Sequence, residues 1–176
     1  MTLATHIPAP RDPDSRYRVA VVCLGNICRS PIADVVLRQA IERAGLSDRV
    51  EVDSSGTGDW HLGHPMDRRA AATLAAAGYD GSAHRAQQFT EDWYEEHDLI
   101  LTMDESNFRD VSALAPDEET AHERVRMFRE FDPRGGYGDL EVPDPYYGGD
   151  DGFAHVLAIV ERTADGLADA LAERLA

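Results

Sequence analysis

One short loop constrains this 176-residue chain more than any other feature. An apolar run at 19–22 leads into a loop from Cys23 to Arg29, and Ser30-Pro31 opens an amphipathic stretch. Proline is tolerated in the first turn of a helix because its missing N–H has no helical partner there. The pattern predicts a strand, a loop at its carboxyl end, and a helix with Ser30 as its N-cap.

Such a loop is suited to hold an anion. Its backbone amides, the positive end of the helix dipole and the planar fork of Arg29 converge on one position. Glycine and asparagine tolerate positive φ, so Gly25 and Asn26 allow successive amides to turn inward. We therefore expect a phosphate site whose binding residues are Leu24, Gly25, Asn26, Ile27, Cys28, Arg29 and Ser30.

Cys23 would lie beneath the bound phosphate. Amide donors, the helix N-terminus, Arg29 and the Ser30 hydroxyl all favour a thiolate, which can attack phosphorus and form a phosphocysteine. An inert core cysteine would need none of these neighbours. A nucleotide P-loop would need a Gly-Lys-Ser/Thr ending, and the chain contains no lysine. A structural zinc site wants four ligands, whereas Cys23 and Cys28 are the only cysteines.

A phenolate leaves readily only when an acid protonates it. Two Asp-Pro pairs could supply that acid, Asp132-Pro133 and Asp144-Pro145, although Asp-Pro is also a common turn. Spacing alone does not choose between them. The rings of Tyr146 and Tyr147 favour Asp144, because apolar surroundings help a carboxyl group to keep its proton.

Four segments together resemble the low-molecular-weight protein tyrosine phosphatases of bacterial type. They are 21–31, 52–57, 103–107 and 144–148, and they follow the family's order. The resemblance implies Cys23 as nucleophile, Arg29 as phosphate clamp and Asp144 as general acid, with no metal or cofactor. It further implies that Ser54 and His84 support Asn26, that Trp60 and Tyr146 flank the cleft, and that Cys28 guards Cys23 against overoxidation.

The substrates implied by the resemblance are phosphotyrosine-containing proteins and small aryl phosphates. It also allows a tyrosine kinase to act on Tyr146 or Tyr147. An arsenate reductase of the same fold would need further cysteines beyond Cys28. A phosphoarginine phosphatase of the family would carry a smaller residue than Ile27. A silent phosphotyrosine-binding module would need neither Cys23 nor an acid.

Composition sets the outer limits. The formal charge of −16 disfavours nucleic acid and anionic membranes as partners. With no apolar span of membrane length and two cysteines in one loop, we expect a cytoplasmic protein. The absence of lysine and the abundance of alanine and arginine suggest a high-GC bacterial host. Residues 1–16 are rich in Pro, Asp and Arg and are expected to form a disordered leader.

Residues 17–176 are expected to form one α/β domain. Strands are predicted at 19–22, 50–54, 99–102 and 125–128, and helices at 31–44, 67–77, 104–114 and 153–175. Strands and helices that alternate in this way indicate a three-layer fold: a four-stranded parallel sheet between helices, with active loops at the carboxyl ends of the strands.

Overall fold

The computed structural model describes residues 3–135 and 139–176, apart from the side chain of Asp150. Four strands form one parallel sheet in the order β2-β1-β3-β4. They are β1 (Tyr17–Cys23), β2 (Val50–Gly56), β3 (Leu99–Thr102) and β4 (Val125–Met127). Within the described residues, no helix is both long and apolar enough to cross a bilayer.

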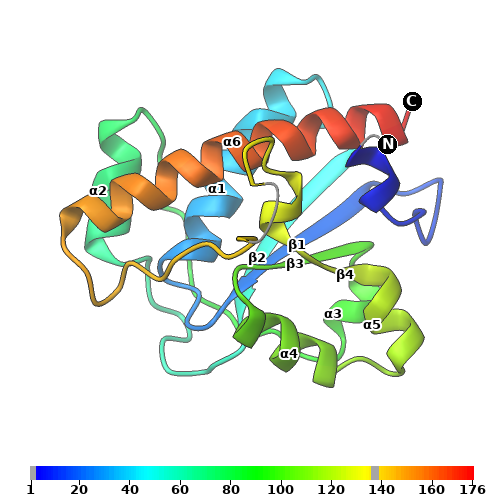
Figure 1. The fold of residues 1–176 in the computed structure, drawn as a ribbon, viewed down its shortest axis with the longest axis horizontal. Helices are drawn as coiled ribbons and strands as arrows, with labels where there is room; N and C mark the ends of the chain where they lie inside the picture. Colours follow the sequence, from blue (N-terminus) through cyan, green and yellow to red (C-terminus); the bar gives the residue numbers. More distant parts are fainter. Residues whose placement is uncertain (1–2, 136–138) are drawn as a thin grey trace.

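Helices cover both faces of the sheet (Figure 1). One layer holds α1 (Arg29–Arg43), α2 (Arg68–Ala76) and α6 (Asp150–Arg174). The other holds α3 (Trp93–Glu96), α4 (Glu105–Ala113) and α5 (Glu118–Arg124). The predicted α/β architecture is therefore confirmed, while the short helices α3 and α5 and the 3-10 turn η2 (Phe128–Phe131), which shortens the fourth strand, were not predicted.

Alternation along the strands divides the core in two. In β1, Val19 and Val21 face the α1 and α6 layer, whereas Ala20 and Val22 face the α3 and α4 layer. The predicted apolar face of α6 packs into the first cluster with Phe153, Val156, Val160, Leu167 and Leu171 fully buried. Burial of each such side chain contributes about 2 kcal/mol, so the long helix holds α1 and the sheet together.

Strand order fixes where a site can form. β1 pairs with β2 on one side and with β3 on the other. The chain therefore continues from β1 to β2 at one side of the sheet and later returns past β1 to form β3 on the other side. In open parallel sheets, ligands bind at the carboxyl ends of the strands at such a switch point. The loop after Cys23 occupies this position.

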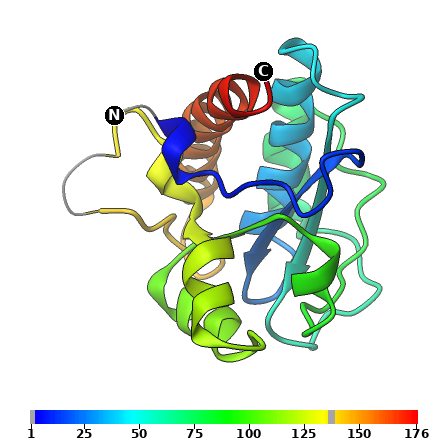
Figure 2. The same cartoon turned by 90° about the vertical axis from the view of Figure 1, so that its right-hand side faces the viewer.

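The prediction of a disordered leader is wrong for residues 3–16; residues 1–2 lie outside the described residues. Residues 3–6 form the 3-10 turn η1 (Leu3–His6), and Ile7 is 3% exposed within the core. Figure 2 shows this segment crossing the end of the sheet at which the strands begin. The Tyr17 hydroxyl donates to the Pro8 carbonyl at 2.9 Å, and Arg124 donates to the Ala9 carbonyl at 2.7 Å. These bonds satisfy the backbone and fix the segment in place.

Candidate active site

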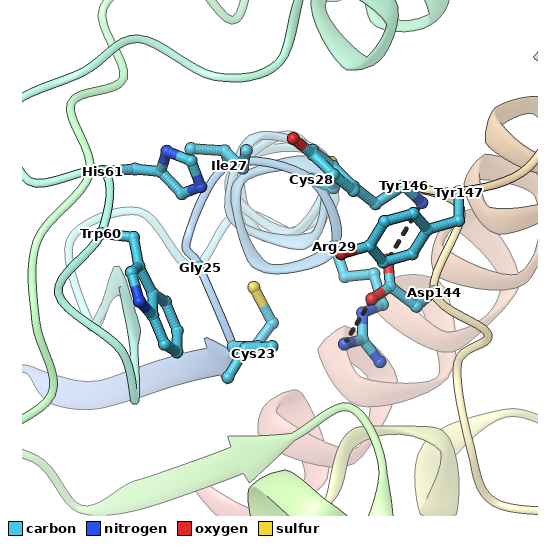
Figure 3. Close-up of a pocket in the computed structure, with 11 residues that line it drawn as sticks. Cys23, Gly25, Ile27, Cys28, Arg29, Trp60, His61, Asp144, Tyr146 and Tyr147 are labelled. Carbon is cyan, nitrogen blue, oxygen red and sulfur yellow. Dashed lines mark hydrogen bonds and ion pairs between the residues drawn. The ribbon is translucent and has the colours of Figure 1, made fainter.

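The loop between β1 and α1 forms the floor of a pocket of about 410 Å³. Trp60 and His61 stand on one side of Cys23, and Asp144 with Tyr146 stands on the other (Figure 3). The structure thus brings together most of the predicted site residues, namely Cys23, Leu24, Gly25, Ile27, Cys28, Arg29, Trp60, Asp144 and Tyr146. Asn26, Ser30, Ser54 and His84 lie behind them, and all but His84 are fully or almost fully buried.

Asn26 holds the loop in its curved shape. Its φ of 55° is the only positive value outside glycine among the described residues. Its side chain donates to the Ser30 hydroxyl at 2.8 Å and to the Ser54 hydroxyl at 3.1 Å, and it accepts from the Gln87 amide at 2.9 Å. Every polar atom of the buried amide group is therefore used, which offsets the cost of its burial.

His84 supports the same residue through the backbone. Its Nε2 lies 2.7 Å from the Asn26 carbonyl oxygen, so Nε2 carries the proton and donates it. Burial lowers the pKa of His84, more than this hydrogen bond raises it, which favours the neutral ring. Gln87, which the sequence analysis did not single out, also donates from its side chain to the Ser54 carbonyl at 3.0 Å.

Glycine meets two different demands here. Gly25 does not adopt the positive φ that its residue type suggested. A Cβ at Gly25 would instead lie 3.2 Å from the His61 ring. At Gly56, a Cβ would lie 2.7 Å from the Leu24 carbonyl oxygen, so glycine is required where the end of β2 approaches the loop.

Cys23 is buried, and its sulfur faces donors. The Ser30 hydroxyl lies 2.9 Å from Sγ, and the Asn26 amide donates to Sγ at 3.3 Å. Ser30 is not the helix N-cap: α1 begins at Arg29, with Cys28 in the cap position and no side-chain cap bond. Because the Ser30 oxygen already accepts from Asn26, its single proton is free for Sγ or for the Ser55 carbonyl at 3.2 Å. An ionised sulfur would accept the hydrogen bond from this hydroxyl in preference to the Ser55 carbonyl.

Arg29 is held in place from below the pocket. It is 3% exposed, and its Nη1 donates to Asp104 at 2.6 Å and to the Val142 carbonyl at 3.0 Å. Asp104 was expected only to begin the helix predicted at 104–114. It does accept from the Asn107 amide at 2.8 Å, but its other oxygen pairs with Arg29. Such anchoring fixes the guanidinium at the pocket, where a planar fork of this kind can bind an oxyanion.

The structure separates the two Asp-Pro pairs. Asp144 lines the pocket with its side chain 40% exposed, and its carboxylate lies 3.7 Å from Arg29 Nη2 (Figure 3). Asp132 is buried away from the pocket and paired with Arg129 and Arg162, each at 3.1 Å. Of these two aspartates, Asp144 is therefore the one that shares a pocket with Cys23.

Cys28 lies in the same loop but in a different setting. Burial raises the pKa of its thiol to about 12, so it remains protonated at neutral pH. Both cysteines are free thiols.

At the mouth of the pocket, Trp60 is 65% exposed and Tyr147 is 92% exposed, which leaves flat rings available to a ligand.

The fold and the site together define a class of protein: an α/β domain in which the loop after the first strand places a buried cysteine and a buried arginine in one pocket. The family model described as low molecular weight phosphotyrosine protein phosphatase matches residues 18–176. The chain belongs to this family.

Named relatives are similar over nearly their whole length. A low molecular weight protein-tyrosine-phosphatase of Streptomyces coelicolor is 48% identical, across 90% of this chain and 96% of the relative. The low molecular weight protein-tyrosine phosphatase A of Mycobacterium tuberculosis is 44% identical, across 90% and 93%. A crystal structure of a protein tyrosine phosphatase from Entamoeba histolytica superposes with a TM-score of 0.82 at 31% identity, covering 89% of this chain and 97% of that one.

Proposed function

We propose that this chain hydrolyses phosphotyrosine in proteins, and small aryl phosphates, through a phosphocysteine on Cys23. The observation that carries the proposal is the position of the Cys23 sulfur, 2.9 Å from the Ser30 hydroxyl, on the floor of a pocket that also holds Arg29 and Asp144. A nucleophile, a phosphate clamp and an acid thus face one space. Membership of a family whose named members are tyrosine phosphatases supports the same conclusion.

The first step is transfer of the phosphoryl group to sulfur. The Cys23 thiolate attacks phosphorus opposite the tyrosine oxygen, and the loop amides with Arg29 stabilise the charge on the three equatorial oxygens. Asp144 gives its proton to the departing phenolate oxygen as the P–O bond breaks. Tyrosine leaves in its neutral form, and Ser30, no longer facing an anion, can turn its hydroxyl toward the Ser55 carbonyl.

The second step is hydrolysis of the phosphocysteine. Asp144, now a carboxylate, takes a proton from a water molecule, which attacks phosphorus on the side that tyrosine has left. Sulfur departs as the thiolate, inorganic phosphate is released, and Asp144 is protonated again. Loss of a general acid typically costs about 10²- to 10⁴-fold in rate, so both steps depend strongly on this carboxyl group.

Two variants test these roles. Cys23→Ser should abolish turnover of phenyl phosphate while inorganic phosphate still binds. Asp144→Asn should lower kcat/KM for phenyl phosphate, whose leaving group needs a proton, far more than kcat/KM for 4-nitrophenyl phosphate, because kcat/KM reports the first step and not the hydrolysis that both esters share. Asp151→Asn, which neutralises an exposed carboxylate at the start of α6, is the matched control. Equal losses in kcat/KM on both esters in Asp144→Asn would remove Asp144 from the acid role.

A substrate panel tests the choice among related activities. Phosphotyrosine should be hydrolysed much faster than phosphoarginine. A phosphoarginine phosphatase of the family would carry a smaller residue than Ile27, whose side chain lines the pocket here. Arsenate reduction should be absent, since the only other thiol is Cys28. Faster cleavage of phosphoarginine would overturn the assignment to tyrosine.

The same proposal includes a cytoplasmic location and a partner kinase. Two unpaired cysteines suit a reducing compartment. Of the two candidate acceptors, Tyr147 is 92% exposed and Tyr146 is 37% exposed, so Tyr147 is the more accessible to a tyrosine kinase. Incubation of the inactive Cys23→Ser variant with a tyrosine kinase, followed by peptide mapping, should place the phosphate there. The Tyr147→Phe variant is the control.

A further inference from the structure

The segment that carries Asp144 has little structure of its own. Residues 143–149 belong to no helix or strand, and most of their side chains are exposed. The backbone amide of Val142, just before them, donates a hydrogen bond to the Met103 carbonyl at 2.7 Å, which fixes this residue. Beyond Val142, the backbone of this segment receives one hydrogen bond from a distant part of the described chain, and its donor is Arg69.

Asp67 links the phosphate loop to the start of α2. Its backbone amide donates to the Ile27 carbonyl at 2.8 Å. Its carboxylate accepts from the Arg69 amide at 2.8 Å and so caps the helix. The first turn of α2 is therefore fixed to the loop that holds Cys23.

The Arg69 side chain extends from that turn to the Asp144 segment. Nε and Nη2 donate to the two oxygens of Asp67 at 3.1 and 3.0 Å, which makes a bidentate pair. Burial raises the pKa of Asp67, but the hydrogen bonds from Arg69 outweigh it and hold that pKa below its ordinary value. Nη2 also donates to the Tyr146 carbonyl at 3.0 Å.

Two aromatic rings fix the same guanidinium. The guanidinium carbon of Arg69 lies 5.5 Å from the centre of the Tyr146 ring and 4.7 Å from the centre of the Phe153 ring. Phe153 belongs to α6 and is fully buried. Both distances are within the range of cation–π attraction. Tyr146 in turn donates from its amide to Asp144 Oδ1 at 3.0 Å. A continuous set of contacts therefore runs from the phosphate loop through Asp67, Arg69 and Tyr146 to the Asp144 carboxylate.

We propose that Arg69 is a positioning residue that holds residues 143–149, and with them the carboxyl group of Asp144, at the edge of the phosphate pocket. The inference rests on the proposed role of Asp144 as the general acid. Arg69 itself lies outside the pocket lining and touches no reacting atom. The contacts use the planar fork, a third donor bond and ring stacking together, and a lysine could not reproduce all three.

The experiment compares Arg69→Gln and Arg69→Lys with Arg68→Gln. Arg68 is an exposed neighbour on the same helix for which the described structure records no hydrogen bond or ion pair, so its variant matches the change in charge. Each variant is assayed with phenyl phosphate and 4-nitrophenyl phosphate, and inorganic phosphate is tested as a competitive inhibitor. Arg69→Gln is also combined with Asp144→Asn.

A misplaced acid gives a distinctive pattern. Arg69→Gln should lower kcat/KM for phenyl phosphate at least about tenfold, and kcat/KM for 4-nitrophenyl phosphate less than about threefold. Inhibition by phosphate should stay within about threefold of the wild type, because the phosphate loop is intact. Arg69→Lys should show the same pattern to a smaller degree, and Arg68→Gln should resemble the wild type. In the Asp144→Asn background, Arg69→Gln should add less than about threefold.

Three results would overturn the inference. They are an equal loss in kcat/KM on both esters in Arg69→Gln, a weakened inhibition by phosphate that accounts for the loss, and full additivity with Asp144→Asn. In each of these cases the proposed function would still stand if the single variant Asp144→Asn lost more activity on phenyl phosphate than on 4-nitrophenyl phosphate. If Asp144→Asn itself shows no such effect, the acid assignment fails, and the inference fails with it.

Discussion

Replacing Asn26 with alanine should destabilise the protein strongly, because this side chain holds the active-site loop. The substitution removes two donor bonds, to the Ser30 and Ser54 hydroxyls, and one acceptor bond from the Gln87 amide. Each is worth about 1 kcal/mol net. Alanine at a φ of 55° adds about 1 kcal/mol, since it lacks the local hydrogen bonding that makes asparagine tolerable there. We expect a loss of about 4 kcal/mol in the free energy of unfolding.

Urea denaturation followed by tryptophan fluorescence measures this loss. Ser54→Ala is the control, because it removes only one of the three partners and should cost about 1 kcal/mol. Where enough folded Asn26→Ala remains, its inhibition constant for inorganic phosphate should rise about tenfold, since the loop amides no longer converge. A loss of less than 1 kcal/mol for Asn26→Ala, or a loss no larger than that of Ser54→Ala, would refute this account of the loop.

Three further predictions concern other parts of the molecule. Ile7→Ala should cost about 2 kcal/mol in urea denaturation without changing kcat, because Ile7 is buried far from the pocket; no loss would mean that the N-terminal segment is not packed. Cys28→Ser should recover less activity than the wild type when a thiol is added after peroxide, because the Cys23 sulfenic acid would have no partner thiol; equal recovery would exclude a guard role. The hydrogen bond from His97 at 2.7 Å is the main cause that lowers the pKa of Asp53. The stabilisation that this bond gives should be complete above the ordinary aspartate pKa, and it should be lost as the pH falls through the lower pKa that Asp53 has in the folded protein. Asp53→Asn should therefore cost about 2 kcal/mol in the free energy of unfolding at pH 7 and progressively less below about pH 4. A cost that does not change with pH would contradict this.

Much of the fold follows from local pattern. The apolar run before Cys23, the proline after it, and glycines at 45 and 78, where φ is positive, mark strand and helix ends in the printed sequence. The short helices α3 and α5 escape such reading because four to seven residues carry too little periodicity. The long helix α6 was predicted almost to its ends, since its apolar face repeats over its whole length.

The N-terminal segment shows where composition misleads. Few apolar side chains and many prolines resemble a disordered leader, yet arginines far along the chain satisfy its carbonyls. Arg126 donates to the His6 carbonyl at 3.2 Å, and Arg174 donates to that of Ile7 at 3.2 Å. Such long-range partners leave no trace in the segment's own sequence.

The site divides in the same way. The loop, its cysteine and its arginine are contiguous in sequence and could be predicted from their spacing. Asp104, Gln87 and Arg69 could not, because each acts through a bond to a residue at least 60 positions away. The two Asp-Pro pairs look alike locally, and only the arginines around Asp132 separate it from Asp144.

Trapping the phosphoenzyme tests the central claim most directly. The wild-type protein is mixed with 4-nitrophenyl phosphate and quenched within the first turnovers, and its peptides are sequenced by tandem mass spectrometry. The account predicts a phosphoryl group on the sulfur of Cys23, absent from Cys28 and absent in Cys23→Ser. A phosphoryl group on another residue, or steady turnover by Cys23→Ser, would contradict it.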